Sequence, residues 1–380
     1  MFNGDKFRKK MKIYLDNAAT TKVDKKVIEK IEQVFLENYG NPSSKHSFGQ
    51  RARSLIDKTR EIISKKINCD PSEIIFTSGG TESDNLALNI LEKGDHLIIS
   101  EIEHPAIFNK ALDLEKSGVE VTYLKVDKDG FVIGLEDAIK KNTKLVSIMH
   151  ANNEVGTIQD LEKIGEICSK NKIIFHSDCV QTFNKEEIDV KKMNLSMISG
   201  SSHKIHGPKG IGFLYCNKKV KLRPLILGGG QELKIRNGTE NVSGIVGFGE
   251  AINLNSETDL IKKLRDYFIY EIEKNIENVK LNGSRLKRLA NNINFSFKRV
   301  EGEAILMSLD LENIYVSTGS ACSSKNLKAS RVLLAMGLDH ATAHGSIRFS
   351  LSKYNTKKEI DVVVEKLKII IKRLRRMSAL

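Results

Sequence analysis

The sequence predicts an α/β fold with a seven-stranded, mainly parallel sheet, followed by a smaller α+β region. Two observations carry this prediction. Short apolar runs recur through the middle of the chain, and most of them are separated by amphipathic segments of helical periodicity. Such alternation implies crossover connections and a sheet that helices cover on both faces. Functional side chains of such a sheet are expected at the carboxyl ends of its strands.

A helix is expected before the sheet begins. Apolar residues between positions 27 and 35 recur with helical spacing. Thr21 and Asp24 precede them in the spacing of a capping box, and Gly40 and Pro42 follow as stop signals.

The strands of the sheet are read from the apolar runs themselves. The segment 161–171 is an amphipathic helix between two of these runs. The predicted strands cover residues 74–77, 96–100, 119–126, 145–150, 172–178, 197–202 and 210–216.

The second region mixes helices and strands. Its predicted elements are a helix near 257–276, strands at 292–297, 314–319 and 346–351, and a closing helix at 357–377. The apolar pattern at 11–16 adds a short strand to this region, so we expect a large domain over 17–255 and a small one over 1–16 and 256–380. Residues 1–10 are expected to be a loose extension.

Composition excludes several classes of protein. The chain has 380 residues, of which 40% are hydrophobic and 29% charged, as in an ordinary globular protein of about two domains. It has neither an apolar run long enough to span a membrane nor a secretory signal, so the cytoplasm is expected. The net charge of +13 favours acidic or phosphorylated partners. Because the basic residues are scattered and aromatic residues are few, direct nucleic-acid binding is not expected.

The cysteines do not predict a disulfide framework or a metal site. There are five, an odd number, and none forms a C-x-x-C pair. The spacing of Cys168, His176 and Cys179 fits no standard zinc pattern, so no metal is expected.

A phosphate-binding turn is suggested where the first predicted strand meets a helix. The segment IIFTSGGTESDNLAL places Gly79, Gly80 and Thr81 where a helix N-terminus exposes unpaired N–H groups. It lacks the lysine of a P-loop, which favours one phosphate without Mg²⁺. An ordinary strand-to-helix turn is the alternative.

Other polar residues follow neighbouring strands of the same sheet. Lys204 comes after the strand at 197–202, and Asp178 ends the strand at 172–178, with Gln181 close behind. A phosphate seat, an imine-forming lysine and a carboxylate for a ring nitrogen are the set that pyridoxal phosphate (PLP) requires. Alone, Lys204 would be a surface residue and Asp178 a helix cap.

Three further residues could act on a ring or a substrate. His104 follows the strand at 96–100 and could stack on a planar ring, although a loop histidine is usually solvated. Asn153 follows the strand at 145–150, in a turn that could contact a ring oxygen and a substrate. Arg348 lies inside an apolar strand and would bind either a substrate carboxylate or an internal acid.

Cys322 differs from the other cysteines. It lies in STGSACSSKN, a stretch of small and polar residues without apolar periodicity, where an accessible thiol could form a reactive thiolate. Cys69, Cys168, Cys179 and Cys216 lie in or beside apolar segments and are expected to be inert.

Taken together, these segments resemble a known family over nearly the whole chain. The motifs are YLDNAATT, GNPSSKHSFG, FTSGGTESDNLAL, EHPAI, MHANNEVG, SDCVQ, SSHKIHGPKGIG, RNGTEN, STGSACSS and SIRFSLS. Their order closely resembles that of the group I cysteine desulfurases, which are class V aminotransferase-like PLP enzymes of fold type I.

The resemblance implies a role for each matched residue. Lys204 would bind the PLP aldehyde, His104 would stack on the ring, and Asp178 would pair with its nitrogen. Asn153 and Gln181 would contact the ring oxygen, and Arg348 with Asn153 would bind the carboxylate of L-cysteine. The phosphate would be held by Gly80, Thr81, Ser201 and His203, with Thr239 of the partner subunit in a homodimer, and Ser202 would also belong to the cofactor site.

The resemblance also implies the course of turnover. Lys204 would move a proton, and the Cys322 thiolate would attack the substrate sulfur, which leaves alanine and a persulfide on Cys322. A protein acceptor in iron–sulfur cluster assembly or tRNA thiolation would then take the sulfur. Cys322 could also serve as a transient iron–sulfur ligand.

Some positions depart from the family pattern. The usual G-G-G-x-E-R-G-x-R is GGGQELKIR here, with Leu233 and Lys234, and the usual L-E-P-S is LKAS, with Lys328 and Ala329. The chain also ends right after its closing helix, without the longer tail by which some relatives dock a scaffold. These departures concern surfaces near the dimer or the acceptor.

Three alternatives remain open at this point. The first two are a selenocysteine lyase and another fold type I PLP enzyme, such as an aminotransferase, which would not need Cys322. The third is a non-catalytic sulfur-relay scaffold that kept the fold.

Overall fold

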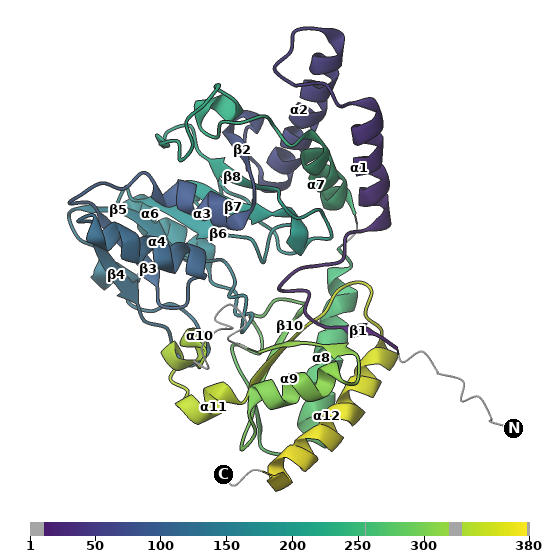
Figure 1. The fold of residues 1–380 in the computed structure, drawn as a ribbon. Helices are drawn as coiled ribbons and strands as arrows, with labels where there is room; N and C mark the ends of the chain where they lie inside the picture. The colour runs from purple at the N-terminus through teal and green to yellow at the C-terminus, as the bar shows by residue number, and fades with distance from the viewer. Residues whose placement is uncertain (1–10, 255, 319–328, 378–380) are drawn as a thin grey trace, which may run out of the picture.

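The computed structural model describes residues 11–254, 256–318 and 329–377 of the chain (Figure 1). The predicted loose extension at 1–10 lies outside the described residues. Among the helices of the described ranges, none is long and apolar enough to cross a membrane.

A seven-stranded sheet forms the upper part of the molecule in Figure 1, and its strand order is β2-β8-β7-β6-β5-β3-β4. Only β8 runs antiparallel to its neighbours within this sheet, so the predicted mainly parallel sheet is confirmed. The strands are β2 Ile74–Thr77, β3 His96–Ser100, β4 Glu120–Leu124, β5 Thr143–Ser147, β6 Ile174–Asp178, β7 Met197–Ser201 and β8 Gly212–Cys216.

Helices cover both faces of this sheet because side chains alternate along each strand. Val146 and Ile198 point to one face of the sheet, whereas their neighbours Leu145 and Met197 point to the other. The face of Val146 is covered by α1 Lys25–Glu37, α2 Ser47–Ile67, α6 Leu161–Lys170 and α7 Val242–Asn253, and the face of Leu145 by α3 Gly80–Leu88 and α4 Pro105–Lys116. A one-turn helix, α5 Leu135–Ala138, completes this part.

A second core lies below the sheet in Figure 1. A four-stranded antiparallel sheet of order β12-β13-β10-β9 packs there with long helices. The helices and strands of this part of the chain are α8 Thr258–Asn275, β9 Val279–Leu281, β10 Asn292–Phe297, α9 Gly302–Asp310, β12 Ser317–Thr318, α10 Arg331–Ala335, α11 His340–His344, β13 Ser346–Ser350 and α12 Lys357–Met377.

The start of the described chain joins the two parts. Strand β1 (Ile13–Tyr14) pairs with β11 (Ile314–Tyr315) beside the second core. The chain then passes Ser350, whose hydroxyl accepts a hydrogen bond from Ala18 N at 2.8 Å. Thr21 next donates to the carbonyl of His203, just after β7. The segment 15–21 therefore lies across the carboxyl edge of the large sheet.

The capping box predicted at Thr21 and Asp24 is wrong. Asp24 is itself the N-cap of α1 and accepts a hydrogen bond from Lys26 N at 3.0 Å. The Thr21 hydroxyl accepts a hydrogen bond from His206 N at 2.8 Å instead. Several predicted boundaries also differ from the observed ones. The largest differences are at β5, which is Thr143–Ser147 where residues 145–150 were predicted, and at the run 314–319, which divides into β11 and β12.

Candidate active site

Lys204 stands at the carboxyl edge of the large sheet. It ends the short 3₁₀ turn Ser202–Lys204 that follows β7. Its Nζ donates hydrogen bonds to the carbonyls of Ala18 and Ala19, both at 2.7 Å. These carbonyls belong to the segment that crosses the edge of the sheet, so the backbone fixes where the amine lies.

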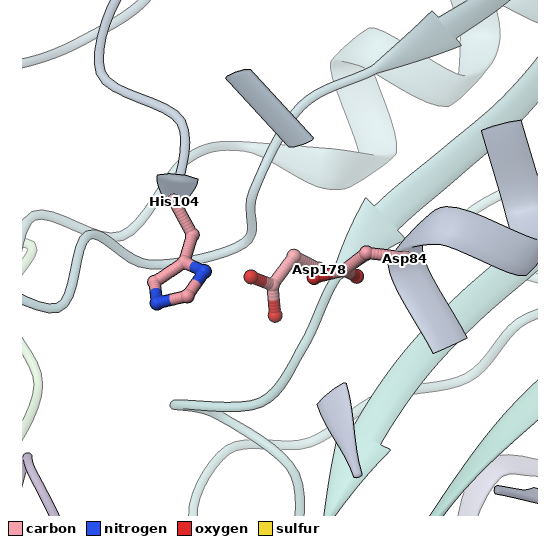
Figure 2. A group of neighbouring side chains, drawn as sticks. All are labelled: Asp84, His104 and Asp178. Atoms are coloured by element: carbon pink, nitrogen blue, oxygen red, sulfur yellow. The ribbon is translucent and has the colours of Figure 1, made fainter. Parts of the chain in front are cut away.

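Asp178 lies on the neighbouring strand, and His104 faces it (Figure 2). The view shows the imidazole of His104 opposite the carboxylate of Asp178, with Asp84 of α3 behind. One ring nitrogen of His104 and one carboxylate oxygen from each aspartate all lie within 4.8 Å of one another. Burial raises the pKa of Asp178, while His104, the Val180 N–H and Lys204 act to lower it.

His104 is held in one orientation and one tautomer. It is the N-cap of α4, and its Nδ1 accepts a hydrogen bond from Ala106 N at 3.2 Å. An accepting Nδ1 leaves the proton of a neutral ring on Nε2. Burial lowers the pKa of His104. The charge of Asp178 acts to raise this pKa, whereas Lys204 and Arg331 lower it further. The residue therefore offers a neutral ring face.

The predicted phosphate turn has the required shape. Gly79 is the N-cap of α3 at φ 155°, a conformation open to glycine alone, and offers no side chain to cap the helix. A Cβ at Gly80 would lie 2.7 Å from Val180 Cγ2, so the close packing needs glycine there too. The first N–H groups of α3 are therefore left for another acceptor. Thr81, in this first turn, is exposed.

Two buried hydroxyls stand at the end of β7 and just after it. Ser201 Oγ faces the turn, 3.9 Å from where a Cβ of Gly79 would lie, whereas Ser202 Oγ lies against Gly207. The Oγ atoms of Ser201 and Ser202 are buried, and neither has a hydrogen-bond partner within the described part of the chain. Gln181 donates from Nε2 to the carbonyl of Ala18 at 3.1 Å, while its Oε1 is buried without a partner among those residues. Such groups are costly unless a ligand or water satisfies them.

His203 lies between these hydroxyls and Lys204. Its Nδ1 hydrogen bonds with the Thr20 hydroxyl at 3.2 Å. Burial and, to a smaller extent, the charge of Lys204 lower the pKa of His203 to about 4, so its ring is neutral near pH 7. A neutral imidazole can donate one hydrogen bond to an anion.

Arg348 lies on β13, opposite Asn153. Its Nη1 donates to the carbonyl of Asn153 at 3.0 Å, and its Nη2 donates to the carboxylate of Asp16 at 2.8 Å. Both alternatives for Arg348 thus have a place in the structure, because Asp16 supplies the internal acid and the buried Nε has no hydrogen-bond partner in the described ranges. That N–H is suited to a substrate carboxylate.

Two predicted residues are not brought into this group. Cys322 lies outside the described residues. Thr239 is exposed in the segment between the 3₁₀ turn Glu232–Lys234 and α7. Its predicted role belongs to a partner subunit.

Two acids near the site were not among the predicted site residues. Glu103 is buried and accepts hydrogen bonds from the Ser100 hydroxyl at 2.5 Å and from Met149 N, and burial raises its pKa to about 8. Glu154 accepts from the Ser330 hydroxyl at 2.5 Å, and burial raises its pKa to about 7. Both directly precede a predicted residue or follow one, in EHPAI and MHANNEVG, which was the available signal.

These residues fit PLP. The orphaned hydroxyls and open helix N-terminus suit a phosphate, Asp178 suits a protonated ring nitrogen, and Lys204 suits the aldehyde. The sheet and the polar groups at its carboxyl edge define the class of protein, which is a PLP-dependent enzyme of fold type I.

Comparison with known proteins narrows this class. The aminotransferase class-V family matches residues 13–363. The cysteine desulfurase IscS of Dictyoglomus turgidum is 49% identical, with 97% of each chain covered. A solved NifS-like protein superposes with a TM-score of 0.89 at 38% identity, over 96% of this chain and 100% of the other. A structure of SspA in complex with cysteine superposes at 0.81 and 38% identity, over 91% of this chain and all of that one.

The chain belongs to the class-V aminotransferase family and, within it, to the group I cysteine desulfurases. The resemblance inferred from the sequence motifs is therefore confirmed, and so are the PLP cofactor and the desulfurase activity. The lyase, aminotransferase and scaffold alternatives are not favoured.

Proposed function

We propose that this cysteine desulfurase converts L-cysteine to L-alanine and receives the sulfur on Cys322 as a persulfide. The carbon–sulfur bond of the substrate breaks, a sulfur–sulfur bond forms on the enzyme, and the hydrogens are retained in alanine and the persulfide. The observation that carries the proposal is the placement of Lys204 at the end of the turn that follows Ser201, whose buried hydroxyl has no partner among the described residues, with Asp178 on the adjacent strand.

Bound PLP would supply an electron-withdrawing ring that stabilises negative charge on the substrate carbon beside the amine. We assign its phosphate to Gly80, Thr81, Ser201, Ser202 and His203, and its ring to His104, Asp178, Gln181 and Asn153. Asp178 can hold a ring nitrogen in its protonated form because a nearby cation stabilises the charge of a buried carboxylate.

Lys204 would act as the proton carrier. Its Nζ is directed by the carbonyls of Ala18 and Ala19, both at 2.7 Å. When the amine is released from covalent attachment, the same carbonyls keep it at the edge of the sheet instead of letting it swing into solvent. A base held within reach of the reacting carbon is the geometric requirement for proton transfer.

Arg348 would orient the substrate through its carboxylate. The guanidinium is fixed by Asn153 O and Asp16, and its unpaired Nε adds a donor for the substrate. The side chain is buried, which strengthens a charge-assisted hydrogen bond. We therefore place the amino-acid substrate between Arg348 and Lys204.

The two ends of the Cys322 segment support its assignment. Before it, Ser317 of β12 pairs with Arg348 of β13. After it, the Ser330 hydroxyl bonds Glu154, next to Asn153. Both ends thus start beside the proposed substrate site.

Two variants test this assignment. In Lys204→Ala, the visible absorption of covalently bound PLP should disappear, and desulfuration should fall by at least about 10³-fold, the upper part of the range for general acid–base catalysis. In Cys322→Ala, the absorption should remain while sulfide release from cysteine is lost. Unchanged release with alanine formation in Cys322→Ala would contradict the persulfide route and indicate a lyase mechanism.

We further propose a homodimer in which Thr239 of the partner subunit completes the phosphate site. Large apolar side chains are exposed on α1 and on the segment before Thr239, as expected of a surface that a second copy covers. They include Phe35, Leu36, Tyr39, Leu225, Ile226 and Leu227.

We propose that a protein acceptor in iron–sulfur cluster assembly takes the sulfur, as the name of the Dictyoglomus relative implies for that protein, with tRNA thiolation as the second route. The free thiols of Cys69, Cys168, Cys179 and Cys216 support a reducing, cytoplasmic setting. We also propose the division into domains at 17–255 and at 1–16 with 256–380, since β1 pairs with β11 and two separate cores lie on either side.

A further inference from the structure

A second carboxyl group lies behind the one proposed for the ring nitrogen. Asp84 projects from α3 toward Asp178 (Figure 2), and only 1% of its surface is exposed. Its Oδ1 has no hydrogen-bond partner within the described ranges. The Asp84, Asp178 and His104 ligand atoms lie within 4.8 Å of one another. Nothing in the proposed reaction uses this buried acid.

The groups that face Asp84 give it no stable positive partner. From β6 come Asp178 and His176, whose Nε2 is 3.9 Å from Asp84 Oδ1. From the segment after β3 come Glu103 and His104. His104 acts on Asp178, as does Lys204. The pair therefore has two buried acids, and the one cation among these groups, Lys204, acts on Asp178.

His176 is held neutral and cannot neutralise Asp84. Its Nδ1 hydrogen bonds with the Ser147 hydroxyl at 2.8 Å, and its Nε2 with the Ser199 hydroxyl at 3.0 Å. Burial lowers the pKa of His176 to about 3. Two hydroxyls that can each accept or donate satisfy a neutral ring, so no proton is drawn from solvent to make the ring cationic.

We propose that Asp84 keeps its proton in the working enzyme and acts as a positioning residue that confines the negative charge of the pair to Asp178. Two buried carboxyl groups this close cannot both ionise without strong repulsion. Burial raises the pKa of Asp84 well above its usual range, and the charge on Asp178 adds to that rise. The proposal rests on the assignment of Asp178 to the ring nitrogen.

The protonated acid can be observed directly, without activity. In holoenzyme labelled with ¹³C-aspartate, infrared spectra near pH 7.5 should contain an isotope-shifted C=O band of a protonated carboxylic acid. The band should be absent in Asp84→Asn. If Asp84→Asn failed to fold, the wild type alone would still test the proposal, because absence of the shifted band in the wild type would overturn it.

Coupling to Asp178 separates a positioning role from a merely structural one. In Asp178→Asn, the Asp84 band should disappear at a lower pH than in the wild type, because the like charge is gone. A midpoint that does not move would overturn the proposal.

The neutral isostere provides the matched variant. In Asp84→Asn, the pH midpoint of the visible PLP spectrum should shift by less than about 0.3 units and the rate of PLP loss by less than about twofold, whereas Asp178→Asn should change both strongly, as expected when a charge partner is removed. If Asp84 were ionised, its replacement would move the spectral midpoint of the bound cofactor to lower pH, and that result would contradict the proposal. Failure of the Asp178 assignment is distinguished from this outcome, because Asp178→Asn would then leave the spectral midpoint and the rate of PLP loss unchanged.

Discussion

Buried acids around the site differ in how their charge is managed. Burial raises the pKa of Asp178, but His104, the Val180 N–H and Lys204 act to lower it. Burial also raises the pKa of Glu103, whose oxygens are bonded to the Ser100 hydroxyl and to Met149 N. Since its pKa is raised to about 8, Glu103 holds a proton near neutral pH. The two acids thus differ in the groups that oppose the effect of burial on their pKa.

The proton on Glu103 predicts a pH effect on stability. The folded chain binds this proton up to about pH 8, but the unfolded chain releases it near 4.5, so the free energy of unfolding should fall as pH rises through that window. Glu103→Gln should remove this slope and become more stable relative to the wild type as pH rises from 5 to 8. Urea denaturation across that range measures it. A constant difference between the two proteins would contradict the prediction.

Arg348 offers a second test at the level of a single residue. Lysine keeps the charge but cannot bond Asn153 O, Asp16 and a substrate carboxylate with one planar group. We expect Arg348→Lys to raise KM for cysteine by about tenfold or more, which corresponds to about 1.4 kcal/mol. The visible PLP spectrum should be unchanged. A changed spectrum with unchanged KM would indicate that Arg348 supports the cofactor and not the substrate.

At the level of elements, the sequence predicts most of what builds the site. The bounds of β2, β3, β10 and α12 agree with the predicted ones, since uninterrupted apolar runs or a full amphipathic pattern mark them. Helix α2 was not predicted, although its buried residues 49, 52, 56, 59, 60, 63, 64 and 67 recur with helical spacing.

What sequence could not predict depends on contacts between distant elements. The rule that strand ends meet at one edge correctly indicated that Lys204 and Asp178 lie near each other. It has no means of placing Asp84, which lies inside a helix, or Asp16, which meets Arg348 only because β1 joins the second core. Only the packing of α3 and β1 brings these acids to the site.

The N-cap of α1 also connects two elements. Asp24 accepts hydrogen bonds from Lys26 N, from Lys353 Nζ at 2.9 Å and from the Tyr354 hydroxyl at 2.6 Å. Asp24→Ala should lower the free energy of unfolding by about 1–2 kcal/mol through loss of the cap, and by more where Lys353 is left unpaired. Asp24→Asn retains the cap and serves as the control, so it should lose less in urea denaturation.

Acid should reduce the difference between Asp24→Asn and the wild type. Hydrogen bonds from Tyr354 and Lys353 hold the pKa of Asp24 well below its usual value of 3.8, despite its partial burial. The stability that the charge contributes is therefore present above about pH 4 and is lost as pH falls below it. Equal loss at pH 7 and pH 3 would show that the charge plays no part.

At the scale of the whole molecule, several large apolar side chains of the proposed interface are exposed in one chain. Leu36 is 70% exposed and Leu227 is 83% exposed, in a segment that continues to Thr239. We expect the wild type to have twice the 42.6 kDa mass of one chain in light scattering. Leu227→Asp should weaken this association and accelerate the loss of PLP, because Thr239 of the partner subunit would be displaced.

A matched leucine controls for loss of apolar surface alone. Leu286 is 89% exposed and lies between β9 and β10, outside the proposed interface. Leu286→Asp should leave both mass and PLP loss unchanged. If Leu227→Asp retained the dimeric mass and the PLP, the proposed interface would be wrong.

The pairing of the first described strand with late parts of the chain has a consequence for biosynthesis. The Ala18 carbonyl accepts a hydrogen bond from Lys204 Nζ, and Ala18 is itself positioned because its N–H donates to the hydroxyl of Ser350. On a ribosome, residues 15–21 cannot settle until β13 has emerged. Vitamin B6 capture by a nascent chain should therefore follow the emergence of β13, and chains truncated before β13 should remain colourless.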